Sequence, residues 1–185
     1  MTTLDTLLND LKTERLAQIS REGWTPEHDD THVQGDFAMA AAAYAVAGRS
    51  EDDSDGTAPA LTRVLWPWTA AELKPHDYRC NLLRAGALVL AELERVERMA
   101  DTVKFFAVGE SSEIYFARDL DALRDLLAER GCLPEHPAEI WEVPGNRMGA
   151  FDEAGEKPGT LRQVFIDTYA HMPPPPAEQL QSHYN

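Results

Sequence analysis

The chain has 185 residues, of which 43% are hydrophobic and 26% are charged. These values are typical of a soluble globular protein that can bury a core without a disulfide or a structural metal. Seventeen basic residues against 32 acidic ones leave a formal net charge of −15. A surface of that sign repels phosphates and anionic lipids, which argues against direct binding of duplex nucleic acid or of a membrane.

The cysteines and the apolar runs bear on the cellular compartment. Cys80 and Cys132 have no C-x-x-C spacing, and two free thiols are typical of the reducing cytosol. No apolar run approaches the roughly 18 residues of a membrane span. The N-terminal segment has charges throughout, instead of the apolar centre of a signal peptide. We therefore expect a cytoplasmic protein.

Helices are predicted for the beginning of the chain. Leucines spaced three and four residues apart predict an amphipathic helix that begins near Leu4 and is interrupted at Gly23. Residues 25–27 (TPE) are typical of a helix start, and this second helix is expected to run to Gly48. Residues 50–60 (SEDDSDGTAPA) are expected to form an acidic loop.

The strongest helix prediction covers residues 77–100. Its buried face is expected to carry Leu82, Gly86, Val89, Leu93 and Val96. The small residues 85–87 would let the alanine run 40–43 approach closely, so we pair these two helices. The tryptophans are expected to cap one end of the pair.

Strands and helices alternate in the second half of the chain. Two β-prone runs, residues 104–108 and 113–117, are separated by a Gly-Glu-Ser-Ser turn and predict a hairpin. The later expected elements are a helix over residues 119–130, a strand over 139–143, a loop over 144–159, a helix over 161–171 and an extended proline run at 173–176. The prediction is an α+β fold, with a mainly helical domain (1–102) and a small ββαβα domain (103–185) that ends in the proline-rich tail.

A candidate divalent-metal site follows the start of the second helix. On a continuous helix, His28, His32 and Asp36 lie at i, i+4 and i+8, within an arc of roughly 80°. Histidines four residues apart can both reach one metal ion, with a carboxylate as third ligand. Glu92 could complete the site if the two helices pack antiparallel. Helix capping and solubility explain the same residues without a metal.

Other polar and aromatic residues have simpler interpretations. Glu94 and Glu97 are interpreted as surface residues that pair with neighbouring arginines. Trp24, Trp66 and Trp68 form a candidate ligand-binding cluster that could stack on a base, although large aromatics at helix junctions are more often core residues. No catalytic residue is predicted, because the sequence has neither a G-x-S-x-G elbow nor a phosphate-binding glycine loop.

Several phrases in the first hundred residues form a distinctive pattern. They are EGWTPEHDD at 22–30 with His32, GDFA at 35–38, AAYA at 42–45, WPW at 66–68, and NLLRAGAL at 81–88 leading into AELER at 91–95. Over roughly residues 15–98, this pattern resembles a group of phage- and prophage-encoded accessory proteins of unassigned function. The resemblance implies a viral gene product that works in a bacterial cytoplasm, and it implies no catalytic residues.

A second similarity concerns acidic pairs. Glu27-x-x-Asp30 and Glu94-x-x-Glu97 are similar to the pairs with which all-α nucleotide pyrophosphohydrolases bind magnesium. In this chain the pairs are far apart and their order is reversed.

Two functions are therefore expected as alternatives. The preferred one is a phage-type accessory protein that binds and modulates a bacterial host protein. It could act as an anti-defence inhibitor whose acidic surface competes for a basic nucleic-acid-binding groove. The other is a metal-dependent nucleotide hydrolase or nucleotide-binding protein that uses His28, His32 and Asp36. The sequence leaves the oligomeric state open.

Overall fold

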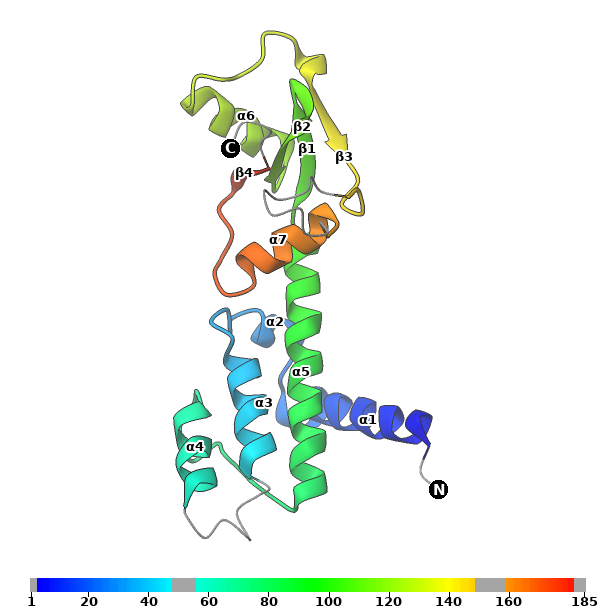
Figure 1. The fold of residues 1–185 in the computed structure, drawn as a ribbon, viewed down its shortest axis with the longest axis vertical. Helices are drawn as coiled ribbons and strands as arrows, with labels where there is room; N and C mark the ends of the chain where they lie inside the picture. Colours follow the sequence, from blue (N-terminus) through cyan, green and yellow to red (C-terminus); the bar gives the residue numbers. More distant parts are fainter. Residues whose placement is uncertain (1–2, 48–55, 149–158, 182–185) are drawn as a thin grey trace. The chain divides into compact units, whose positions relative to one another are not determined.

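The computed structural model describes residues 3–47, 56–148 and 159–181. In chain order these contain α1 (Leu4–Glu22), α2 (Pro26–Asp29), α3 (Asp36–Ala47), α4 (Thr57–Leu65), α5 (Tyr78–Asp101), β1 (Lys104–Val108), β2 (Glu110–Ala117), α6 (Leu120–Glu129), a 3₁₀ turn (Pro137–Glu139), β3 (Ile140–Val143), α7 (Leu161–Tyr169) and β4 (Ala177–Gln181) (Figure 1). A helical region, α1–α5, precedes an antiparallel four-stranded sheet with interspersed helices, so the predicted α+β class is confirmed.

The chain divides into two compact units, Met1–Arg95 and Val96–Asn185. The division falls within α5, whereas the sequence predicts a boundary after residue 102. Leu88 of α5 belongs to the core of the helical unit, and Val96 and Ala100 belong to the core of the sheet unit.

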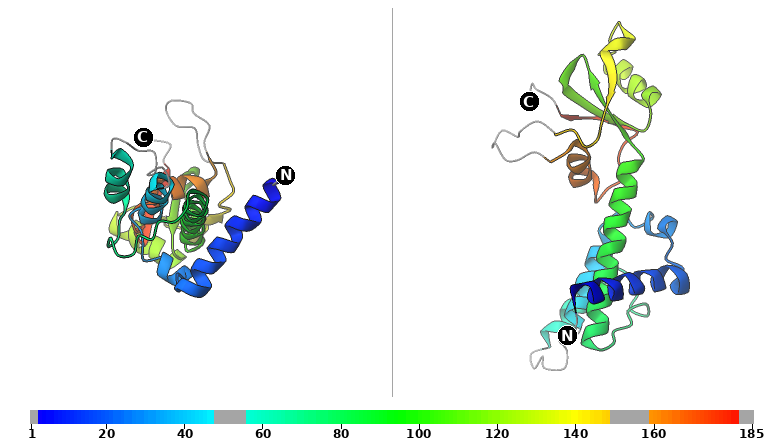
Figure 2. Two further views of the ribbon diagram at one scale, coloured as in Figure 1. Left: turned by 90° about the horizontal axis from the view of Figure 1, so that it is seen from below. Right: turned by 90° about the vertical axis from the view of Figure 1, so that its right-hand side faces the viewer.

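Alanines form the contact between α3 and α5 in the helical unit. Ala40, Ala41 and Ala43 pack in one buried cluster with Ala85 and Ala91, and the two helices run side by side (Figures 1 and 2). The same cluster contains Phe37, Tyr44, Trp66 and Leu88. The predicted pairing of these helices is confirmed, because small side chains on both partners allow a close approach.

The buried face of α5 differs from the predicted one. Leu82, Val89 and Leu93 are 43–54% exposed, and of the larger predicted residues only Val96 is buried. The buried residues of α5 in the helical unit are Asn81, Ala85, Ala87, Leu88, Ala91 and Arg95. The small and hydrogen-bonded side chains are therefore inside, and a stripe of large apolar ones remains on the surface.

The helix predicted from residue 25 to Gly48 is broken, so that prediction is wrong. α2 ends at Asp29, α3 begins at Asp36, and Gly35 between them has a left-handed φ of 77°. The preceding interruption is confirmed, since α1 ends at Glu22 and Gly23 has a φ of 78°.

The acidic loop predicted over residues 50–60 is only partly tested. Of this range, residues 50–55 lie outside the described residues, and α4 begins at Thr57. The loop prediction is therefore wrong for residues 57–60, where a weak local helix signal is stabilised by contact with α3.

The sheet of the second unit has the strand order β3-β1-β2-β4. β1 and β2 form the predicted hairpin, with Phe105 opposite Phe116 and with Gly109 at the turn in a left-handed conformation. β4 pairs with β2 and was not predicted, because the proline run at 173–176 indicated only an extended tail.

Both faces of this sheet are buried, as the continuous apolar runs at residues 105–108 and 114–117 indicate, because successive side chains of a strand point to opposite faces. One face packs Phe105 and Phe116 against Phe165 of α7. The opposite face packs Phe106 and Tyr115 in a cluster with Leu123 and Leu127 of α6. Each face thus has its own helix as a cover.

Two further observations concern the cysteines and the helices. Cys80 and Cys132 are free thiols. None of the helices in the described part of the chain is both long and apolar enough to cross a bilayer.

Tyr169 links α7 to β4 and supplies a testable pH dependence. Its hydroxyl donates to Glu178 Oε2 (2.9 Å), and burial, followed by this hydrogen bond, raises the pKa of Tyr169 from 10.0 to about 12. Because folding favours the neutral phenol, its contribution to stability is complete below pH 10 and is lost as the pH rises through about 12.

We expect Tyr169→Phe to lower the unfolding free energy near neutral pH by about 1 kcal/mol. In urea unfolding followed at increasing pH, this difference from the unmodified protein should shrink between pH 10 and 12. A constant difference across that range would contradict the assigned role of the phenol.

Candidate functional site

The segment between α1 and α3 gathers aromatic rings. After Gly23, Thr25 caps α2 by accepting a hydrogen bond from the backbone N–H of His28 (3.4 Å). The short helix and the following turn bring three rings together. The centroid of the His28 ring lies 6.5 Å from that of Trp24 and 5.0 Å from that of His32.

A buried ion pair fixes this segment to the rest of the helical unit. Arg15 Nη2 lies 2.5 Å from Asp29 Oδ2 and 2.8 Å from Glu94 Oε2, and Arg15 Nε also donates to Glu94 Oε2 (2.9 Å). Arg15 is 3% exposed and Asp29 is fully buried. The arginine on α1 therefore joins α2 to α5.

Two surface carboxylates of α5 form ion pairs with arginines on other elements. Glu94 pairs with Arg15, which lies 79 residues away on α1. Glu97 pairs with Arg162 (Oε2 to Nη2, 2.7 Å), which lies in the sheet unit together with Glu97. Both carboxylates thus join distant segments, a role that helical spacing alone does not indicate.

The rings of the α1–α3 segment line a small recess, which we call the aromatic recess. It encloses about 90 Å³ and is lined by Trp24, His28, His32, Phe37, Trp68 and Glu72. The ring of Trp68 lies 5.9 Å from that of Trp24 and 5.4 Å from that of His32, between centroids. Trp68 Nε1 is buried and has no hydrogen-bond partner among the described residues.

The three tryptophans predicted to bind a ligand are separated into two roles by the fold. Trp24 and Trp68 line the aromatic recess. Trp66 is 8% exposed, donates through Nε1 to the carbonyl of Thr69 (2.9 Å), and packs edge-on against Tyr44 and Trp68. Trp66 is therefore a core residue behind the recess.

The residues predicted to bind a metal do not form the expected constellation. His32 Nδ1 lies 3.0 Å from Asp36 Oδ2, and His28 is next to His32, but the helix on which all three should share a face is broken. Glu92 forms a bidentate pair with Arg95 at 2.8 and 2.9 Å instead of turning to the histidines. Within residues 3–47, 56–148 and 159–181, no group of three or more His, Cys, Asp or Glu residues could hold a metal ion.

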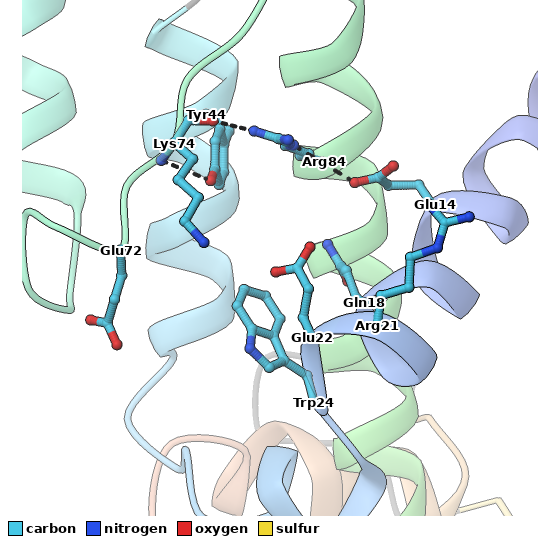
Figure 3. A pocket seen from close by; sticks show the side chains of 9 residues that line it. All are labelled: Glu14, Gln18, Arg21, Glu22, Trp24, Tyr44, Glu72, Lys74 and Arg84. Atoms are coloured by element: carbon cyan, nitrogen blue, oxygen red, sulfur yellow. Dashed lines mark hydrogen bonds and ion pairs between the residues drawn. The ribbon is translucent and has the colours of Figure 1, made fainter.

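A larger recess adjoins the aromatic one and shares Trp24 and Glu72 with it. We call it the charged recess. It encloses about 360 Å³ and is lined by Glu14, Gln18, Arg21, Glu22, Trp24, Tyr44, Glu72, Lys74 and Arg84 (Figure 3). These residues come from α1, the link between α1 and α2, α3, α5 and the segment before α5, all within the helical unit.

Hydrogen bonds hold one wall of the charged recess in place. Arg84 Nη1 donates to the carbonyl of Lys74, Arg84 Nε lies 3.7 Å from Glu14 Oε1, and the guanidinium lies 5.7 Å from the ring centroid of Tyr44. The hydroxyl of Tyr44 accepts from the backbone N–H of Lys74 (3.3 Å). On the other side, Glu72 Oε2 accepts from both the backbone and the hydroxyl of Thr69 (2.9 Å each). Arg84, Tyr44 and Glu72 are thus fixed by the fold.

The charged recess was missed by sequence reasoning because its residues are distant in the chain. Gln18, Lys74 and Arg84 share no local motif. One signal was available: Arg15 and Gln18 are polar residues on the leucine stripe of α1, and both are buried. Polar residues on such a stripe require buried partners.

Comparison with protein-family models, with curated proteins and with solved structures gives no match. The two recesses are therefore interpreted from their own geometry.

Proposed function

We propose that this chain is a non-catalytic accessory protein of phage type that binds and modulates a bacterial host protein. The observation that carries the proposal is the exposed leucine stripe on the first half of α1. The phage and host context rests on the resemblance of residues 15–98, and the acidic composition supports a partner with a basic surface.

The leucine stripe runs along the whole of α1, but only its second half is covered by other helices of the unit. Leu4, Leu7 and Leu8 lie within about 100° of the helix circumference with Leu11 and Arg15, which pack toward α5. Leu4, Leu7 and Leu8 are 70%, 41% and 53% exposed. The first half of α1 extends away from the other helices of its unit (Figures 1 and 2).

The exposed stripe of α5 lies on the side where α1 crosses it. Leu82, Val89 and Leu93 lie within about 60° of Gly86 around the helix axis. A Cβ at Gly86 would overlap Leu11 Cδ2, so this is the point of contact with α1. We call the leucines of α1 and the stripe of α5 together the apolar corner, and exposed apolar surface of this kind is typical of protein interaction sites.

Charge supports a basic partner. With a net charge of −15, the chain is attracted over several ångströms to a positively charged surface, such as a nucleic-acid-binding groove. The apolar corner would then make the short-range contact with the partner. The acidic surface would guide the two proteins together and compete with nucleic acid for the basic groove.

The test is affinity capture from bacterial lysate with three forms of the full chain. We expect one host protein to be captured by the unmodified chain and by Val64→Glu, whose site on α4 is 75% exposed and serves as the control. Leu4→Glu combined with Leu8→Glu should reduce its capture at least about tenfold, since two charges in an apolar contact cost several kcal/mol. Higher salt should also weaken capture.

Light scattering on the same proteins separates the partner from self-association. A monomer at micromolar concentration is the expected result. A dimer that the double substitution dissociates would assign the corner to a second copy and overturn the host-partner proposal. Capture that is equal for all three forms, or absent above background, would also overturn it.

A further inference from the structure

We propose that the charged recess binds a small aromatic zwitterion, of which an aromatic amino acid is the simplest example. In this arrangement the ligand ammonium group faces Gln18 and Glu22, the carboxylate faces Lys74, and the ring lies against Trp24. The site is separate from the apolar corner and does not depend on a protein partner.

A buried acceptor without a partner points to a ligand donor. Gln18 is 3% exposed, and its Oε1 has no hydrogen-bond partner among the described residues, although the side chain lines the charged recess (Figure 3). Buried polar atoms are nearly always paired, and an unpaired one costs about 1–3 kcal/mol. An N–H or ammonium group in the recess would supply the missing donor.

The balance of charge in the recess favours a ligand that has both signs. Three carboxylates, Glu14, Glu22 and Glu72, and three cations, Arg21, Lys74 and Arg84, line it. A ligand with several negative charges, such as a nucleotide, would face as many carboxylates as cations. A zwitterion can satisfy one group of each sign.

Three of the six charged groups that line the recess remain available to a ligand: Arg21, Lys74 and Glu22. Arg84 and Glu72 are held by the fold through Glu14 and Thr69. Within the described parts of the chain, neither Lys74 Nζ nor the Glu22 carboxylate has a hydrogen-bond or ion-pair partner. Figure 3 shows the Lys74 amine and the Glu22 carboxylate on the same side of the recess as the Trp24 ring. Two of the three free charged groups, Lys74 and Glu22, therefore flank an aromatic wall.

Trp24 provides that wall in a fixed orientation. Its ring is stacked on His28 with an interplanar angle of 10° and packs against Trp68, so it is supported by the aromatic recess. An indole face binds flat rings and cations. The volume of about 360 Å³ lies at the lower end of the range of small-molecule sites, which suits a ligand of amino-acid size.

The test uses L-tryptophan and two analogues that each lack one of its groups: tryptamine lacks the carboxylate, and indole-3-propionate lacks the amine. Adenosine monophosphate is the fourth probe and represents an anionic nucleotide. Affinity is measured by titration calorimetry and by saturation-transfer NMR on the full chain. We expect L-tryptophan to bind and each truncated analogue to bind at least about tenfold more weakly, since each loses a charge-assisted hydrogen bond.

Substitutions assign each charge to its partner. Lys74→Ala should weaken L-tryptophan about tenfold and leave tryptamine unchanged, and Glu22→Gln should weaken L-tryptophan and leave indole-3-propionate unchanged. Both residues are exposed, so circular dichroism should show an intact fold, and Lys12→Ala on exposed α1 surface serves as the matched control. No binding of L-tryptophan at millimolar concentration overturns the proposal. So does tighter binding of adenosine monophosphate, or an equal effect of Lys74→Ala on L-tryptophan and tryptamine.

Discussion

Replacement of Arg15 by methionine is expected to lower the unfolding free energy by about 3–5 kcal/mol. The Arg15 guanidinium contacts both the buried carboxylate of Asp29 and the carboxylate of Glu94. Its removal leaves Asp29 fully buried and without its arginine, and an uncompensated buried charge is among the most destabilising changes known for single substitutions. A loss of this size is a large fraction of the roughly 5–15 kcal/mol that stabilises a typical domain.

The measurement is urea unfolding followed by tryptophan fluorescence, because Trp24, Trp66 and Trp68 all report on the helical unit. Arg21→Met, on the exposed side of α1, is the matched control and should change the unfolding free energy by less than about 1 kcal/mol. Arg15→Met combined with Asp29→Asn should lose less than the sum of the two single losses, since the double variant has no unpaired charge at Asp29. A loss below about 1 kcal/mol for Arg15→Met would contradict the anchoring role.

The local signals in the sequence were sufficient for most helix starts. Thr25, Asp119 and Thr160 each accept a hydrogen bond from the backbone N–H three residues later, at 3.4, 2.8 and 3.2 Å. A cap depends only on residues within one helical turn, so the sequence contains all that determines it. The same reasoning explains why Gly23 was correctly predicted to interrupt the first helix.

Elements that depend on distant partners were not predicted. β4 follows a proline run and becomes a strand by pairing with β2, from Ala177 opposite Ala117. The buried face of α5 is likewise decided by α3, whose alanines accept Ala85 and Ala91 in place of the larger Leu82 and Val89. Hydrophobic periodicity identifies a helix, but packing partners select the face that is buried.

In the candidate site, too, the contacts between residues close in the chain were predicted and those between distant residues were not. His28 and His32 were placed together from the sequence because they lie four residues apart, and their rings do lie next to each other. The charged recess was not predicted, since Gln18 and Lys74 meet only after α1 is anchored by Arg15. The recess proposed to bind a zwitterion is thus a consequence of tertiary structure.

The largest effect expected in the sheet unit is that of Phe116→Ala, which should lower the unfolding free energy by about 3–5 kcal/mol. Phe116 is fully buried on β2, and its ring lies 4.8 Å from that of Phe165 and 5.0 Å from that of Tyr169, between centroids. The substitution removes an aromatic ring from the contact between the sheet and α7 and leaves a cavity that neighbouring rings can only partly fill.

Two controls separate this cavity effect from other causes. Phe116→Leu retains most of the apolar volume and should cost less than about 1.5 kcal/mol, and Leu133→Ala, at a site 47% exposed, should stay within about 0.5 kcal/mol. Unfolding is followed by far-ultraviolet circular dichroism. Equal losses for Phe116→Ala and Phe116→Leu would show that ring contacts with Phe165 and Tyr169, and not the buried volume, determine the stability of this core. A loss for Phe116→Ala no larger than that for Leu133→Ala would contradict the packing of α7 on this face of the sheet.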